Sequence, residues 1–148
     1  MKGLHVVFRV GAADYVLPAA DVLQMESYGG VTPVPGLPPF VAGIVQVRGR
    51  VIPLLDLRAR FGLPAAASEE GRRIVVAQHK SRAVGLLVDS AREVLQIPPE
   101  SFGAAPQVVA GAAEGLVKAV AHVGQRLFLL LDFAQLIGEE VLDGAQVP

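Results

Sequence analysis

Apolar and polar residues alternate at the start of the chain, which is the pattern of a β-strand. Residues 4–10 carry apolar side chains at every second position, and His5 falls on the opposite, more polar face. This period of two is typical of a strand that is buried on one side. We therefore expect a half-buried strand over residues 4–10, paired with residues 15–17 as a hairpin.

One longer pattern occurs twice. Residues 50–62 (RVIPLLDLRARFG) and 126–138 (RLFLLLDFAQLIG) each contain an Arg, an apolar strand, an Asp where the strand stops, and a short amphipathic turn closed by Gly. Two such segments indicate two copies of a small β-rich module. Asp56 is a candidate N-cap for a short helix over 57–61, and a second short helix is expected over 133–137.

Turn signals between apolar runs predict the remaining elements. The glycine of the Arg48-Gly49 pair can supply the positive φ of a hairpin turn. Pro53 within a strand implies a sheet edge or a bulge. Four prolines make residues 31–39 a rigid loop without regular pairing, and residues 18–23 suit one helical turn. The further strands are expected at 24–28, 44–47, 50–55, 72–78, 82–88, 93–97, 116–122 and 126–131.

The pattern divides the chain into two similar halves, roughly 1–62 and 72–138, joined by the linker-like segment 63–71. Residues 15–25 and 84–97 each read as a strand, an Asp, then Val-Leu-Gln and an apolar residue. Regularly spaced hairpins favour closed or nearly closed β-barrels. We expect a single domain over 1–148, built from two intertwined barrel subdomains with a groove between them.

Composition supports strands that are buried on both faces. Hydrophobic residues make up 52% of the 148 residues, and the mean hydropathy is +0.48. No apolar run approaches the roughly 18 residues needed to cross a bilayer, and the first 20 residues lack a signal-peptide pattern. We expect a cytoplasmic protein without direct membrane insertion. A net charge of −1 and 5% aromatic residues argue against nucleic-acid binding.

The sequence offers little chemistry. It has no cysteine, so disulfides, thiolate metal sites and cysteine nucleophiles are excluded. His5, His79 and His122 are far apart, and none has a metal-ligand partner at the usual spacing. Nucleophile-elbow, dinucleotide and P-loop motifs are absent. We expect no metal and no cofactor.

One enzymatic alternative involves Asp89. Residues 86–91 read LLVDSA, similar to the catalytic loop of aspartic proteases. A protease dyad needs two carboxyl groups that share a proton, so a homodimer would have to supply the second Asp89. The competing interpretation is that Asp89 caps a turn at a strand end. A β-barrel module that binds a small ligand or RNA is a third possibility.

A protein-binding site is suggested by the turn at Val47, Arg48 and Gly49. It is either an ordinary charged hairpin tip or an arginine held rigidly beside apolar strand residues, an arrangement suited to anchoring a protein partner.

The residues described above resemble the CheW family of bacterial chemotaxis coupling proteins. The family pattern P-x-x-P-x-F-x-x-G-x-x-N-L-R-G-x-x-[IV]-P-[IV]-x-D-L-R-x-x-F is similar to residues 29–62, and V-G-[IL]-[LV]-V-D-x-V-x-E-V-L-x-[IL] is similar to residues 84–97. The resemblance spans about residues 4–138. The matching positions in the first segment are Pro39, Phe40, Gly43, Arg48, Gly49, Ile52, Pro53, Asp56, Leu57, Arg58 and Phe61.

The resemblance implies a mostly β fold of two five-stranded, SH3-like barrels that share a hydrophobic core, with short helices. It implies a non-catalytic adaptor that couples the cytoplasmic tips of methyl-accepting chemoreceptors to the regulatory domain of a CheA-type histidine kinase. The receptor tip would lie in the groove between the barrels, and the kinase would dock at barrel ends. A related adaptor in a non-flagellar chemosensory pathway is the alternative.

The resemblance also carries over a candidate partner-binding set. By position, Val22, Gly43 and the turn at Val47, Arg48 and Gly49 match segments linked to receptor and kinase coupling. The kinase-contacting strand is matched by Gln24 and Met25. Gln24 stands where an acidic residue is common in the family. That acid could pair with Arg48, so the neutral amide is expected to remove a charged partner.

Overall fold

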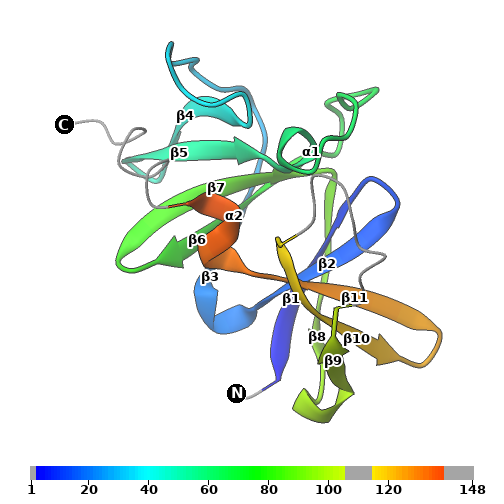
Figure 1. Cartoon of the computed structure of the whole chain (residues 1–148). Coiled ribbons are helices and arrows are strands. Elements are labelled where there is room, and N and C mark those ends of the chain that lie inside the picture. Colours follow the sequence, from blue (N-terminus) through cyan, green and yellow to red (C-terminus); the bar gives the residue numbers. More distant parts are fainter. Residues whose placement is uncertain (1–2, 106–114, 139–148) are drawn as a thin grey trace.

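The strands form two sheets that lie side by side (Figure 1). The structure, a computed structural model, describes residues 3–105 and 115–138. The six-stranded sheet has the order β8 (Ser90–Gln96), β1 (Leu4–Val10), β2 (Ala13–Pro18), β11 (Arg126–Leu131), β10 (Val117–Val123) and β9 (Phe102–Ala104). The five-stranded sheet has the order β3 (Val22–Ser27), β6 (Arg73–His79), β7 (Arg82–Val88), β5 (Arg50–Asp56) and β4 (Val41–Val47). The helical segments are α1 (Leu57–Arg60), α2 (Phe133–Ile137) and the 3-10 turns η1 (Ala19–Asp21) and η2 (Pro99–Ser101).

Each sheet combines strands from both halves of the chain. The β1–β2 hairpin lies between β8 and β11, and the β6–β7 hairpin lies between β3 and β5. In both sheets the inserted hairpin pairs in parallel with the strand that precedes a short helix, β11 in one sheet and β5 in the other. The order β8-β1-β2-β11-β10 therefore repeats the order β3-β6-β7-β5-β4.

The predicted fold class is confirmed: the protein is mostly β, with two sheets and short helices. Two details differ from the expectation. One sheet has six strands because β9 pairs with β10. Among the described residues, no ladder joins the two edge strands of either sheet, so the sheets curl without closing into barrels.

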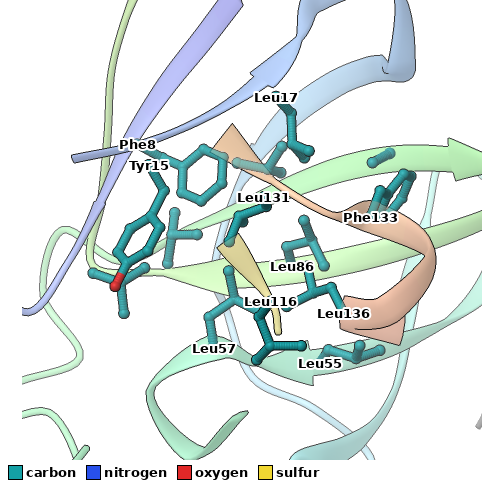
Figure 2. Packing of buried hydrophobic residues seen from close by; sticks show 14 of the residues in the cluster. Phe8, Tyr15, Leu17, Leu55, Leu57, Leu86, Leu116, Leu131, Phe133 and Leu136 are labelled. Carbon is teal, nitrogen blue, oxygen red and sulfur yellow. The ribbon is translucent and has the colours of Figure 1, made fainter. Parts of the chain in front are cut away.

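Apolar side chains form three clusters, one within the curl of each sheet and one between the sheets. The cluster shared by the sheets includes Phe8, Leu86 and Leu136 and is shown in Figure 2. Neighbouring residues of one strand alternate between clusters: Phe8 belongs to the shared cluster, whereas Val7 lies inside the six-stranded sheet. Strands with two buried faces explain the high apolar content.

This arrangement corrects the prediction for the first strand. β1 is buried on both faces rather than on one, and His5 is only 8% exposed. The His5 Nδ1 atom lies 2.8 Å from the Gly3 carbonyl oxygen, and its ring packs against Phe102. The sequence prediction took His5 to mark a solvent-exposed face, but a single histidine does not distinguish an exposed face from a buried one.

Pro53 lies in β5, between β7 and β4, so the prediction of an edge strand is wrong. The pairing of β5 with β7 covers only Leu54 to Asp56, so Pro53 stands just outside that ladder. Its missing N–H therefore interrupts no pairing with β7. A bulge does occur nearby, in β4 between Val41 and Gly43.

Candidate functional site

The sequence-predicted partner-binding residues lie at the two opposite edges of the five-stranded sheet. Val22, Gln24 and Met25 are on β3, at one edge. Gly43 and Val47 are on β4, at the other edge. The Arg48-Gly49 turn joins β4 to β5. A flat sheet would keep these two groups apart.

The curl of the sheet brings the two edges together at Arg48. Its Nε atom lies 3.5 Å from Oε2 of Glu26 on β3. Gln24 donates a hydrogen bond from Nε2 to the same Glu26 oxygen, at 2.8 Å. Gln24, Glu26 and Arg48 thus form one connected group, which ties the β4–β5 turn to β3.

This group corrects the expectation that Gln24 leaves Arg48 without a charged partner. The carboxylate comes from Glu26, two positions further along β3, and Gln24 holds that carboxylate in place. The Arg48 side chain is still 74% exposed, so a docking protein can reach it. Because the pair is largely solvated, its contribution to folding stability is small.

The β4–β5 turn has an unusual backbone. Both Arg48 and Gly49 have positive φ, 49° and 81°. Two successive residues with positive φ match the type I′ turn, which suits the twist of a two-residue hairpin. The sequence predicted this geometry for Gly49 alone. The same conformation at Arg48 fixes the direction in which its side chain leaves the turn.

Three apolar side chains are exposed on the strands that carry this group. Met25 is 38% exposed, Leu23 is 46% exposed and Val51, next to Arg50 on β5, is 52% exposed. Exposed large apolar residues on the edge strand β3 and at the start of β5 are typical of protein-binding surfaces. Of these three, only Met25 was in the predicted set.

Gly43 and Val47 are buried, in contrast to the rest of the predicted set. Val47 belongs to the cluster inside the five-stranded sheet. Gly43 has a φ of 148°, and an added Cβ would overlap the Thr32 carbonyl group. Thr32 and Ile44 exchange two backbone hydrogen bonds of 2.9 Å, which hold the proline-rich loop against β4. Gly43 and Val47 are therefore buried residues that support β4 and the adjoining loop, and they are not part of the exposed surface.

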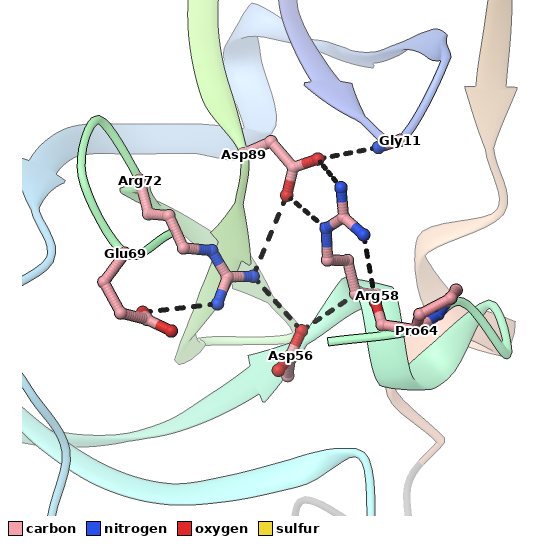
Figure 3. Close-up of polar contacts among 7 residues, drawn as sticks. All are labelled: Gly11, Asp56, Arg58, Pro64, Glu69, Arg72 and Asp89. Carbon is pink, nitrogen blue, oxygen red and sulfur yellow. Dashed lines mark hydrogen bonds and ion pairs between the residues drawn. The ribbon is translucent and has the colours of Figure 1, made fainter. Parts of the chain in front are cut away.

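A second polar group, which the sequence did not predict, joins the two sheets (Figure 3). Arg58 of α1 donates two hydrogen bonds of 2.8 Å, from Nε and Nη2, to the Asp89 carboxylate between β7 and β8. The Gly11 N–H, in the β1–β2 turn, donates a third, also 2.8 Å. Asp56 caps α1 by accepting a hydrogen bond from the Arg58 N–H.

Arg72 completes this group from the start of the second half. Its side chain is only 5% exposed and lies 3.4 Å from Asp56, 3.5 Å from Glu69 and 3.9 Å from Asp89. The resemblance included Asp56 and Arg58 as matching positions without a role. The structure gives them one: they connect α1 to the β1–β2 turn and to the β7–β8 junction.

Asp89 does not have the environment of a catalytic carboxyl group. Burial raises its pKa, but the hydrogen bonds from Arg58 and Gly11 and the nearby positive charges outweigh burial, so the pKa lies below its usual value. An aspartic-protease dyad instead has to retain a shared proton. The hydrogen bonds from Gly11 and Arg58 fit the competing interpretation instead, in which Asp89 caps a turn at the end of a strand.

Other chemistry has little support in residues 3–105 and 115–138. No group of three or more His, Asp or Glu side chains is placed there to hold a metal ion. No helix in the same ranges is long and apolar enough to cross a membrane. What the structure offers is two curled sheets with an exposed apolar and charged end, which is the form of a protein-binding scaffold.

Comparison with known proteins agrees with this form. The model of the CheW-like domain family matches residues 4–141. Chemotaxis protein CheW of Rhizobium meliloti is 29% identical over 140 residues, which cover 95% of this chain and 90% of the relative. Protein FrzA of Myxococcus xanthus is 31% identical over 131 residues, covering 88% and 82%. The crystal structure of the scaffolding protein TtCheW from Thermoanaerobacter tengcongensis has a TM-score of 0.85 at 27% identity and covers 95% of this chain and 96% of that one.

The chain belongs to the CheW-like family, whose model covers nearly all of it. It is a non-catalytic chemotaxis adaptor, as the relatives and the scaffolding-protein structure indicate. The pairing of the partly buried Asp89 with Arg58 agrees with this conclusion.

Proposed function

We propose that this adaptor couples the cytoplasmic tips of chemoreceptors to the regulatory domain of a CheA-type histidine kinase. The observation that supports the proposal most is the Arg48–Glu26 pair, which joins β3 and the β4–β5 turn into one exposed end of the five-stranded sheet. The kinase domain docks at this end, against Met25 and Arg48. The receptor tip lies at the surface, in the groove along the junction of the two sheets and outside the shared cluster, and the adaptor works in the cytoplasm at receptor arrays.

The predicted set divides into two kinds of residue in this proposal. Gln24, Met25, Arg48 and Gly49 lie on or beside the exposed turn and act by contact or by holding Arg48. Val22 packs against the shared cluster at the start of β3. The buried members, Gly43 and Val47, act by fixing the shape of β4. Separate weak contacts of this kind gain strength from the array, because each bound partner raises the effective concentration of the next.

The test is co-sedimentation of the purified adaptor with receptor-containing membranes and the kinase. We expect Arg48→Glu to reduce recovery of the ternary complex by about tenfold or more, because the variant places a carboxylate opposite a surface that binds an arginine. Gln125→Glu, in the β10–β11 turn of the other sheet, is the control. Unchanged recovery with Arg48→Glu would show that the site lies elsewhere.

A second candidate is the same adaptor role in a chemosensory pathway with another output. Two relatives that match over most of the chain have names other than CheW, Protein PilI and Protein FrzA, and they support this second candidate. Capture of the bound kinase from the native cell and its identification would distinguish the two pathways.

We also propose that residues 1–148 form one domain made of two related halves, roughly 1–62 and 72–138. The equivalent strand orders of the two sheets support this duplication. The exchange of the β1–β2 and β6–β7 hairpins supports a single folding unit, because neither half contains a complete sheet.

A further inference from the structure

The two sheets have equivalent ends, which allows one to be compared with the other inside the same molecule. β3 pairs with β6 and β8 pairs with β1, and both pairings contain an irregularity at the corresponding place. Just after this irregularity, Gln24 lies opposite Val76 in the five-stranded sheet, and Glu93 lies opposite Val7 in the six-stranded sheet. Val76 and Val7 each face the interior cluster of their own sheet. Gln24 and Glu93 therefore occupy equivalent positions.

The arginines at these ends are equivalent as well. Arg50 begins β5 and closes the β4–β5 hairpin opposite Val47. Arg126 begins β11 and closes the β10–β11 hairpin opposite Val123. Both are the Arg that opens the repeated segment of the sequence.

In the six-stranded sheet, the arginine is neutralised within the chain. Arg126 Nη2 lies 2.6 Å from a Glu93 oxygen and 3.5 Å from an Asp14 oxygen. Asp14 also pairs with Arg9, at 3.2 Å. The guanidinium of Arg126 further covers the ring of Phe128, 4.7 Å from its centroid.

In the five-stranded sheet, the corresponding acids are missing. Gln24 replaces Glu93, and Ala83 holds the place of Asp14, since Gln78 pairs with Ala83 as Arg9 pairs with Asp14. Arg50 is exposed and forms no ion pair with any residue in the described ranges. The nearby acid, Glu26, is already bonded to Arg48 and Gln24.

We propose that the regulatory domain of the kinase supplies the missing carboxylate. Its docking surface carries an Asp or Glu that pairs with Arg50, and apolar residues that cover Leu23, Met25 and Val51. This inference rests on the proposed function. It adds that the partner surface carries a carboxylate and that Arg50 is the residue that binds it. Val51, 52% exposed, follows Arg50 directly on β5, and Leu23 and Met25, 46% and 38% exposed, flank Gln24 on β3. An unpaired arginine and exposed apolar side chains support a protein surface as the occupant. Arginine binds a carboxylate in a fixed two-pronged geometry, so the pair confers specificity as well as affinity.

The test is calorimetric titration of residues 1–148 of the adaptor with the purified regulatory domain of the CheA-type kinase from the same organism, at low and at moderate salt. We expect Arg50→Glu to weaken binding about tenfold or more and to reduce its dependence on salt. The control, Lys118→Glu, makes the same change in charge on an exposed residue of the six-stranded sheet and should bind as the wild type does.

The outcomes separate the two levels of the proposal. If the wild type binds and Arg50→Glu binds within twofold of it, the inference about Arg50 is overturned while the proposed function stands. If the wild type does not bind the kinase domain at all, the proposed function fails and the inference fails with it. Thermal unfolding of each variant checks that the fold is intact. Arg50→Lys keeps the charge but loses the two-pronged geometry, so it should bind more weakly than the wild type and more tightly than Arg50→Glu.

Discussion

At the scale of single residues, Gly43 shows how close backbone packing restricts a position to glycine. Its φ of 148° favours glycine, and the Thr32 carbonyl occupies the space that a Cβ would need. We expect Gly43→Ala to lower the free energy of unfolding by about 2–3 kcal/mol, because the proline-rich loop has to move away from β4. Urea unfolding followed by circular dichroism measures the change.

Gly29 provides the matched control for that substitution. It precedes the same loop, and an added Cβ there would meet nothing within 4 Å. Gly29→Ala should therefore alter the unfolding free energy by less than about 0.5 kcal/mol. Equal losses in the two variants would mean that the contact with Thr32 has no special importance.

The contact between Arg48 and Glu26 marks the limit of what sequence reasoning can reach at this scale. The sequence drew attention to Arg48 and to the neutral Gln24. It could not identify Glu26 as the partner, because β3 and the β4–β5 turn belong to opposite edges of the sheet and meet only after the sheet curls.

At the scale of secondary-structure elements, the polar group around Asp89 fixes how α1, the β1–β2 turn and the β7–β8 junction meet. Its lowered pKa means that the folded protein binds a proton at Asp89 less readily than the unfolded chain does. The group therefore stabilises the fold above the unfolded pKa of about 4, and this stabilisation is lost as pH falls through the lower, folded pKa.

Asp89→Asn should remove this stabilisation. We expect a loss of about 2 kcal/mol at neutral pH, because Arg58 and the Gly11 N–H lose a charged acceptor. The difference from the wild type should shrink as the pH falls below about 4. Urea unfolding at a series of pH values tests this, with Asp21→Asn, at a partly exposed aspartate of η1, as the control. A difference that does not change with pH would contradict the assignment of the charge to Asp89.

Elements were predicted best where the signal is local. The hairpins, the Asp56 cap and both short helices follow from turn and capping residues a few positions apart. The internal repeat was aligned less well: the similar Val-Leu-Gln segments equate Gln24 with Gln96, whereas the strand register equates Gln24 with Glu93. The alignment followed residue similarity, whereas the true equivalence depends on the β-bulges in β3 and β8, which no sequence pattern revealed.

At the scale of the whole molecule, the exchange of hairpins ties the two halves into one structure. Each sheet places two strands from one half between strands of the other, and the shared cluster draws residues from both sheets (Figure 2). Strand order is the part of the fold that the sequence predicted least, because pairing between distant strands depends on the final packing rather than on local propensity.

A cut in the linker tests this interdependence. We expect fragments 1–67 and 68–148, separated after the exposed Ala67, to be unstable alone, because an isolated hairpin is marginally stable and each fragment lacks strands of both sheets. Mixed together, they should assemble into a complex with the circular dichroism spectrum and cooperative unfolding of the intact chain. Size-exclusion chromatography would show one species of the combined mass. Cooperative unfolding of fragment 1–67 by itself would mean that the first half forms its own complete sheet, and that the exchanged hairpins are a consequence of covalent linkage instead of the basis of the fold.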